Sequence, residues 1–238
     1  MSVRLKNSLL SFVFCASLVS AATPVSKSAE QWRRLQGPDG ASIEVLFSHG
    51  DYLFAGGYDA VFRSTDQGQS WAMVNAGIDP PDSYANQIKV LNVNAAGATR
   101  LIAGRDYDGL YISTNRGQTW RPTIIFSGQL HTLKVIGSAI FAGGSFAGGS
   151  RVLISRDNGL SWTPSNAGLD KVGSVSAFAA KGDRIYLAGN GVYVSSDGGR
   201  SWAPINDGLT NLDVRGLVVN DAFLFATTSH GELFARRL

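Results

Sequence analysis

The stretch SSDGGRSW at residues 195–202 decides the fold of this chain, because close copies of it occur three more times. The other copies are STDQGQSW at 64–71, STNRGQTW at 113–120 and SRDNGLSW at 155–162. The tryptophans that end the four copies are 49, 42 and 40 residues apart (71 to 120, 120 to 162 and 162 to 202). Self-similarity at such a period predicts a repeat architecture.

The third repeat shows what one unit contains. Residues 130–136 alternate in polarity, Gly137 and Ser138 form a turn, and residues 139–143 are a second apolar run. A glycine-rich loop at 145–150 leads to a third run at 151–154, and a fourth begins at Ser161 after the motif. Short apolar runs between glycine and Asx turns predict strands. Four strands per repeat, with no helical periodicity, predict an all-β fold in which each repeat is one β-propeller blade.

We call each copy of the motif a box and expect its residues to be structural. The aspartate carboxylate, or the carbonyl oxygen of Asn115, can accept backbone N–H groups of its own turn. The glycine suits a positive φ, and the tryptophan is expected to bury its ring as the next strand begins. These structural residues are Ser64, Asp66, Gly68 and Trp71; Ser113, Asn115, Gly117 and Trp120; Ser155, Asp157, Gly159 and Trp162; and Ser195, Asp197, Gly199 and Trp202.

The spacing predicts five four-stranded blades, the last of which is completed from the other end of the chain. Residues 214–219, 223–226 and 231–235 match the first three strands of the preceding unit. Residues 31–35, which contain Trp32, resemble residues 201–205 around Trp202. We expect this N-terminal strand to complete the last blade and so remove its open edge. The alternatives are an open array or a dimer that shares blades, and we expect a monomer.

Residues 1–22 are typical of a secretory signal, and residues 23–238 are expected to form one propeller domain. Arg4 and Lys6 precede a short apolar stretch at 9–19, and small residues follow at 20–22. The alternative is a buried N-terminal strand. With the signal removed, the chain would lose its one cysteine, Cys15, and the net charge would fall from +3 to +1. We therefore expect a secreted or periplasmic protein without disulfides, without a nucleic-acid partner and without a transmembrane segment.

The pattern Ser-x-Asp-x-Gly-x-x-Trp resembles the Asp-box, or BNR, repeat across nearly all of the expected mature chain. That family includes sialidases, xyloglucanases, sortilin-type receptors and photosystem II assembly and stability factors. The resemblance implies that the boxes are structural and lie away from the ligand face. In style the repeats most resemble photosystem II assembly-factor-like and uncharacterised secreted BNR proteins. Known assembly factors of this kind have more blades than five, so the likeness does not carry over their role.

Two sets of loops are expected to share the face opposite the boxes. These loops carry tyrosines beside carboxylates, which suit sugar rings, although ordinary solvated loops have the same composition. The candidate ligand-binding residues in the loops are Tyr58, Asp59, Asp106, Tyr107 and Asp108.

A second candidate group comes from aligning the innermost strands of the repeats. Each has a polar residue after a core aliphatic, and we expect these polar side chains to point toward the channel mouth. They either form a polar ligand site or a hydrated ring of mutually paired charges. The four members that can carry charge are Glu44, Lys89, His131 and Arg215.

No catalytic signature stands out in the sequence. Glycoside hydrolysis requires two carboxyl groups at a fixed separation, which a sequence cannot show. The three histidines lie in different repeats without metal-ligand spacing, and Gly143–Ser150 lacks the lysine of a phosphate loop. We therefore expect no metal and no cofactor. The favoured function is an exported non-catalytic propeller that binds a protein partner or ligand, and the alternative is a glycan-binding lectin or small glycoside hydrolase.

Overall fold

A computed structural model describes residues 34–35, 37–38, 41–57, 60–78, 88–95, 98–105 and 108–238, with side chains omitted for 88–95 and 98–99. The chain divides into two units, Met1–Arg34 and Leu35–Leu238. All of the assigned strands belong to the second unit. The expected signal at residues 1–22 and the expected strand at Trp32 lie outside the described residues.

The described residues form five antiparallel sheets, which we number in chain order. Sheet 1 contains β1 (Ile43–His49), β2 (Tyr52–Gly57), β3 (Val61–Ser64) and β4 (Ala72–Met73). Sheet 2 contains β5 (Ile88–Ala95), β6 (Ala98–Arg105), β7 (Gly109–Ser113) and β8 (Arg121–Ile124). Sheet 3 contains β9 (Gly128–Ile136), β10 (Ala139–Phe146), β11 (Val152–Ser155) and β12 (Thr163–Pro164). Sheet 4 contains β13 (Ala177–Lys181), β14 (Arg184–Gly189), β15 (Gly191–Ser195) and β16 (Ala203–Pro204), and sheet 5 contains β17 (Val214–Val219), β18 (Phe223–Thr228) and β19 (Leu233–Arg237).

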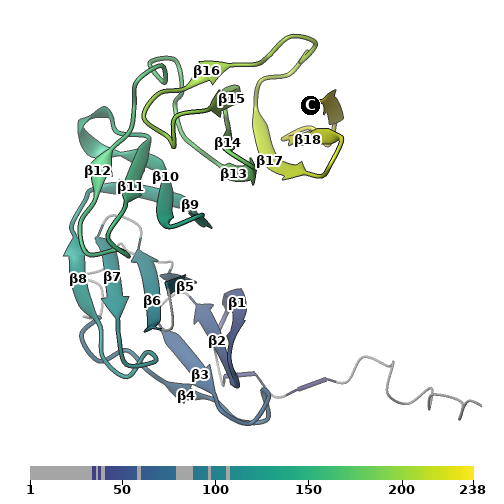
Figure 1. The fold of residues 1–238 in the computed structure, drawn as a ribbon. Helices are drawn as coiled ribbons and strands as arrows, with labels where there is room; N and C mark the ends of the chain where they lie inside the picture. Colours follow the sequence, from purple (N-terminus) through teal and green to yellow (C-terminus); the bar gives the residue numbers. More distant parts are fainter. Residues whose placement is uncertain are drawn as a thin grey trace, which may run out of the picture. The chain divides into compact units, whose positions relative to one another are not determined.

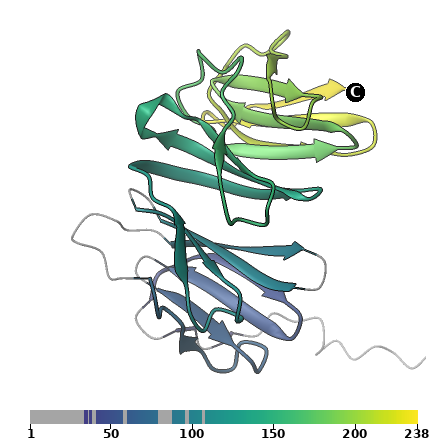
Figure 2. The same ribbon diagram turned by 60° about the vertical axis from the view of Figure 1, so that its left-hand side comes forward.

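Within every sheet the strands pair in chain order, as Figures 1 and 2 show. The one helix among the described residues is a single 3-10 turn, η2 (Ala147–Gly149). The prediction of an all-β fold built from four-stranded units is therefore confirmed, although sheet 5 has three described strands. Several predicted boundaries differ by a few residues. In sheet 3, β9 begins at Gly128 and β10 continues to Phe146, because these two residues pair with each other, and the fourth strand begins at Thr163, where pairing with Ile154 starts.

Each box forms a hydrogen-bonded turn between the third and fourth strands. In the fourth box the Ser195 hydroxyl donates to Asp197 (2.7 Å) and accepts the N–H of Gly199 (2.8 Å). Asp197 also accepts the N–H (3.0 Å) and the hydroxyl (2.6 Å) of Ser201. In the second box Asn115 accepts the N–H of Thr119 (2.9 Å) and donates its amide to the Thr119 hydroxyl (2.8 Å). The amide therefore replaces the carboxylate without changing the geometry of the turn.

Two adjacent residues in every box adopt positive φ. The box glycines have φ between 80° and 86°. The residue before each glycine is also in this region, with φ of 58° at Gln67, 59° at Arg116, 60° at Asn158 and 71° at Gly198. Paired positive φ values allow a tight reversal between the strands. The sequence predicted only the glycine half of this pair.

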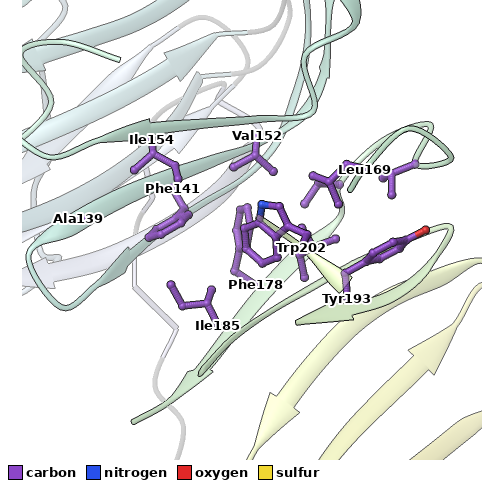
Figure 3. Close-up of a cluster of buried hydrophobic side chains, with 12 residues drawn as sticks. Ala139, Phe141, Val152, Ile154, Leu169, Phe178, Ile185, Tyr193 and Trp202 are labelled. Atoms are coloured by element: carbon purple, nitrogen blue, oxygen red, sulfur yellow. The ribbon is translucent and has the colours of Figure 1, made fainter. Parts of the chain in front are cut away.

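Four hydrophobic clusters fill the spaces between successive sheets. The cluster between sheets 3 and 4 brings Phe141 and Ile154 together with Phe178 and Trp202 (Figure 3). The Phe141 and Phe178 ring centroids are 5.7 Å apart, within the range of favourable aromatic pairs. Trp120, Trp162 and Trp202 each lie in the cluster shared with the preceding sheet. One sheet therefore supplies the surface on which the next buries its box tryptophan.

Trp71 differs from the expectation that every box tryptophan is buried, since its side chain is only partly buried. It packs on a small cluster of Ala55, Ala60 and Phe62 on sheet 1 itself. Within the described residues, its indole nitrogen has no hydrogen-bond partner. Among the described residues no sheet precedes sheet 1, so none covers Trp71 as sheets 1, 2 and 3 cover Trp120, Trp162 and Trp202.

Removing one box hydroxyl tests the turn. Ser195→Ala should lower the free energy of unfolding by about 1–3 kcal/mol, because it leaves the buried Gly199 N–H without its acceptor. The neighbouring Ser196 is exposed, so Ser196→Ala should change stability by less than about 0.5 kcal/mol. Urea denaturation of both variants makes the comparison, and equal losses would contradict the assigned role of Ser195.

The boxes also predict an acid response. Hydrogen bonds, chiefly from the Ser161 hydroxyl, lower the pKa of Asp157 from 3.8 to about 2. A carboxyl whose pKa is lower in the folded state contributes stability above its unfolded pKa, and this contribution is lost as pH falls from about 4 to 2. Asp157→Asn should therefore reduce the loss of stability between pH 5 and pH 2.

The reverse change is the matched control. Asn115→Asp places a carboxylate in an equivalent turn and should make the loss of stability in acid steeper. Unfolding free energies measured between pH 5 and pH 2 compare the two variants with the native chain. If Asp157→Asn leaves the acid response unchanged, the Asp157 carboxylate is not a source of it.

Candidate functional site

Three of the aligned charged residues lie at β-bulges on innermost strands. Ile43 and Val45 pair with the consecutive residues Gly57 and Gly56, which leaves Glu44 as the extra residue of β1. In the same way the β9–β10 register leaves His131 extra, and the β17–β18 register leaves Arg215 extra. Bulges re-aim a side chain and are common next to functional sites. The repeat therefore places a charged residue at the same strand end in three sheets.

The bulge side chains are exposed, and hydrogen bonds tie the same region of neighbouring sheets together. Glu44 and His131 are exposed, as is Arg215 with 61% of its side-chain surface accessible. Nδ1 of His131 lies 2.8 Å from the Ser174 hydroxyl. Ser176, directly before β13 of sheet 4, has the aligned position, and its hydroxyl donates to the Val214 carbonyl of sheet 5 (2.7 Å). The ends of the innermost strands therefore carry polar side chains, and hydrogen bonds connect this region of one sheet to the next.

The structure describes only some of the other predicted site residues. Lys89 pairs in regular register with Gly104, so its strand has no bulge at this position, and its side chain is outside the description. Tyr58, Asp59, Asp106 and Tyr107 lie outside the described residues. The expectation that a core aliphatic precedes each charge is wrong at Ile43, which is 37% exposed while Leu130 and Val214 are buried. Leu130 and Val214 pack against a preceding sheet, whereas no sheet precedes Ile43 within the described part of the chain.

Sheet 5 carries a network of polar side chains beside Arg215. Arg215 pairs with Asp213 at 2.9 Å, and the Ser229 hydroxyl is the largest cause of the lowered pKa of Asp213, followed by Arg215. Next to this pair, Glu232 accepts hydrogen bonds from Asn211 (2.9 Å) and Thr228 (3.0 Å). Nδ1 of His230 lies 3.0 Å from the same Asn211 amide. Asp213 is thus held ionised beside an exposed cation, an arrangement that suits polar or charged ligand groups.

Asp108 was predicted as one of the ligand-binding loop residues. In the structure its carboxylate contacts side chains of its own sheet. It forms an ion pair with Arg105 (2.9 Å), whose side chain is only 3% exposed, and accepts the Tyr111 hydroxyl (2.7 Å). A buried arginine needs such partners because burial of a charge is costly. Asp108 therefore anchors the end of β6 to the start of β7, and the burial of Arg105 was not predicted from the sequence.

A second recurring element escaped the sequence reasoning. The carboxamide oxygens of Asn75, Asn166 and Asn206 accept backbone N–H groups at or next to the start of the third strands, from Val61 (2.7 Å), Arg151 (2.9 Å) and Val192 (2.7 Å). Each asparagine is followed two residues later by glycine and then by isoleucine or leucine, at Gly77, Gly168 and Gly208. This Asn-x-Gly spacing was the signal in the sequence that could have revealed the element.

Two absences concern only the part of the chain that the structure describes. There, no group of three histidine, cysteine, aspartate or glutamate residues is arranged to hold a metal ion. No helix in the same part has the length and apolar character needed to cross a membrane.

Comparison with known families gives one match. The BNR/Asp-box repeat model matches residues 111–122, which contain the second box. Together with the propeller structures below, this match confirms the resemblance predicted from the four boxes. No curated protein matches the sequence.

Several solved structures resemble the fold at low sequence identity. An ancestral GH74 enzyme is 20% identical with a TM-score of 0.64, and the match covers 87% of this chain and 31% of the enzyme. YCF48 bound to a D1 peptide is 18% identical with a TM-score of 0.60, covering 86% of this chain and 67% of YCF48. PorZ, a surface component of the type-IX secretion system of Porphyromonas gingivalis, is 16% identical with a TM-score of 0.59, covering 85% of this chain and 34% of PorZ. This chain therefore spans about a third of the GH74 enzyme and of PorZ, and the likeness concerns the fold.

The two ion pairs of the site region differ in burial and predict different losses. Asp108→Ala should destabilise the protein by about 3 kcal/mol, since it removes the carboxylate that faces the buried Arg105. Arg215→Ala breaks a pair whose members are 61% and 48% exposed, and should cost less than about 1 kcal/mol. Denaturant unfolding of the two variants checks this order, and a larger loss for Arg215→Ala would reverse the assignment.

Proposed function

We propose that this chain is an exported, non-catalytic β-propeller that binds a protein partner or ligand through the strand ends that carry the charged bulges. The observation that carries the proposal is the recurrence of an exposed residue that can carry charge, Glu44, His131 or Arg215, at the same bulge in three sheets. Bulges interrupt pairing and are retained where a side chain must be re-aimed. Lys89 occupies the aligned position in sheet 2, and Tyr58, Asp59, Asp106 and Tyr107 follow in the neighbouring loops.

The boxes support a non-catalytic assignment because their aspartates are committed to the turns. Hydrogen bonds from Ser70, Ser64 and the backbone lower the pKa of Asp66 to about 2. The pKa of Asp197 is lowered in the same way, chiefly by the Ser201 hydroxyl. A general acid needs a pKa near the working pH, which these carboxylates do not have.

The comparisons support a binding role by analogy. One similar structure is YCF48 bound to a D1 peptide, and another is PorZ, an essential surface component of a secretion system. A third is a GH74 enzyme. Because of this likeness, the alternative function remains a glycan-binding lectin or small glycoside hydrolase. These likenesses are below 25% identity, so the role of this chain rests on its own charged strand ends and the analogy only adds to it.

The proposal includes export and a closed ring. Residues 1–22 would act as the signal peptide and residues 23–238 would fold as one monomeric propeller. The five sheets would be the five blades, with the strand at residues 31–35 completing the last. A closed ring would hold the bulge residues of different blades around one opening, where a single partner could contact several of them.

Binding can be tested with matched variants on the two faces. One variant replaces the bulge residues Glu44, His131 and Arg215 with alanine. The control replaces Gln69, Gln118 and Arg200, which are exposed on the box turns. Residues 23–238 of the native chain and of both variants are immobilised and incubated with exported proteins. The same three proteins are also applied to a glycan array.

We expect reproducible protein binding that the bulge variant loses by at least about tenfold and the box variant retains. Glycan binding with the same pattern would favour the lectin alternative and require a cleavage assay. Binding that both variants retain, or that only the box variant loses, would contradict the proposed face.

A further inference from the structure

The box turns lie at the same end of the sheets as the hairpins between first and second strands, and we call this the box end. In sheet 4 the hairpin at residues 182–183 joins β13 to β14, and Ile185, near the start of β14, pairs with Ser195, the first residue of the box. In sheet 3 Ile140 pairs with Ser155 in the same way. The bulges and the links from one sheet to the next lie at the opposite ends of the strands, which we call the bulge end.

Exposed charges of opposite sign gather at the two ends, if each residue of the five sheets is counted toward the end that it is nearer. Among the residues whose exposure is described, the exposed basic residues of the box end are Arg116, Arg121, Lys134, Arg156, Arg184, Arg200, Arg236 and Arg237. The exposed acidic residues of that end are Asp51, Asp183 and Asp221. The exposed charge of the box end is therefore +5, eight basic residues minus three acidic ones.

The bulge end has the opposite balance. Its exposed basic residues are Lys171 and Arg215, and its exposed acidic residues are Glu44, Asp170, Asp207, Asp213 and Glu232. The exposed charge there is −3, two basic residues minus five acidic ones. The half-buried charges do not change the sign of the box end, since Arg63, Arg100 and Lys181 balance the aspartates of the three Asp-containing boxes.

Basic side chains cross three sheet junctions at the box end. Arg63 of sheet 1 donates to the Arg116 carbonyl of sheet 2 (3.0 Å), and Arg156 of sheet 3 donates to the Gly198 carbonyl of sheet 4 (2.7 Å). Lys181 of sheet 4 donates to a carbonyl of the β17–β18 hairpin of sheet 5. Each contact joins a cation to a neutral carbonyl group, so it positions the charge without neutralising it.

Within the part of the chain that the structure describes, no ion pair involves a basic residue of the box end. The two ion pairs there, Arg105–Asp108 and Arg215–Asp213, both lie at the bulge end. Arg200 donates to the backbone carbonyl of Asp197 (3.2 Å). A guanidinium has five N–H donors, so one such contact leaves others for the oxygens of a phosphate.

A groove between sheets 3 and 4 brings two of these cations together. It has a volume of about 520 Å³, within the range of pockets that hold small ligands, and its lining includes Arg156, Arg200 and Ser138. Asp183 and Asp197 also line it, and the box hydrogen bonds hold the Asp197 carboxylate. This mixture of donors and acceptors suits a headgroup in which a phosphate adjoins hydroxyl groups.

Exposed apolar side chains lie among the cations. Leu160 is 41% exposed and takes the position in the third box that Arg200 has in the fourth. Phe223 is 38% exposed and pairs with Arg237 across β18 and β19. At a bilayer surface, apolar side chains enter the boundary between headgroups and acyl chains while neighbouring cations remain at the phosphates.

We propose that the box end is a docking surface for a bilayer that contains anionic lipids. Its exposed cations come from four sheets, an arrangement that suits an extended array of phosphates better than a single small anion. The reversal of charge between the two ends would orient the protein as it approaches. Docked in this way, the protein would hold its bulge end, where we propose that the partner binds, away from the bilayer.

Co-sedimentation with vesicles measures the docking. The full chain is mixed with vesicles of phosphatidylglycerol and phosphatidylcholine in equal parts, and vesicles of phosphatidylcholine alone give the baseline, which includes any contact of the apolar stretch at 9–19. We expect at least about tenfold stronger binding to the anionic vesicles at about 0.1 M salt. The preference should vanish at about 1 M salt, where the screening length falls to about 3 Å. Equal binding to both kinds of vesicle would overturn the proposal.

A matched pair of charge reversals locates the surface. Arg184→Glu at the box end and Lys171→Glu at the bulge end each change the net charge by two units, and both side chains are exposed. A basic residue near an anionic surface strengthens binding about fivefold, so Arg184→Glu should weaken it at least about tenfold. Lys171→Glu should weaken it by less than about twofold. Equal losses would show that net charge alone attracts the protein, contrary to the proposal.

Two substitutions of Arg156 separate its charge from its contact with Gly198. Arg156→Gln removes both and should weaken vesicle binding about fivefold, whereas Arg156→Lys keeps the charge and should retain binding within about twofold. The melting temperature of each variant shows whether the junction of sheets 3 and 4 is intact. Equal loss of binding in both variants would assign the effect to the junction and overturn the role of the charge.

Apolar variants distinguish a lipid surface from another polyanion. Leu160→Ser should weaken binding to the anionic vesicles, and Leu212→Ser, which changes a 45% exposed residue of the bulge end, should not. Tighter binding of the native chain to duplex DNA than to these vesicles would overturn the lipid assignment in favour of a nucleic acid. None of the variants changes a bulge residue, so loss of vesicle binding and loss of partner binding can be told apart.

Discussion

The structure depends on every sheet finding a neighbour on which its tryptophan can be buried. A four-stranded sheet of this size cannot cover both of its faces, so its stability comes from the junctions. Trp120, Trp162 and Trp202 each dock on the preceding sheet through the ring and through the indole N–H. Replacing a buried tryptophan with alanine typically costs about 3–5 kcal/mol, so these residues dominate the junctions. The box turn serves this contact, because it fixes where the tryptophan lies, directly before the fourth strand.

The same requirement explains where the repeat is incomplete. Trp71, Ile43 and Leu46 have the character of junction residues, yet they are partly or largely exposed. A cavity lined by Gly208, Leu209 and Phe234 lies at the other end of the array. Both features are expected of an array whose first and last sheets meet, which is the closed ring proposed above. The charged bulges stand apart from this logic, since exposed charges contribute little to a junction, and this is why we assign them to binding.

Much of this fold could be predicted from residues alone, because the box combines several strong local preferences. Serine, aspartate and glycine at fixed spacing specify a turn, and alternating runs around them specify strands. The bulges at Glu44, His131 and Arg215 could not be predicted, since a bulge is a property of the register between two strands. The buried Arg105 was missed for a related reason, as its partner Asp108 was interpreted as a loop residue. The exposure of Trp71 and Ile43 depends on the position of their sheet in the array, which a single repeat does not show.

Hydrogen–deuterium exchange across residues 31–35 tests most directly whether these residues complete the last sheet, as the proposed closed ring requires. The account predicts that the Trp32 amide exchanges as slowly as that of Trp202, which donates to the Ala167 carbonyl. Residues 233–237 of β19 should also be protected on the side that faces away from β18. Exchange of residues 31–35 at the rate of an unstructured peptide, with the outer side of β19 unprotected, would contradict the claim that the tryptophan junctions extend to sheet 5.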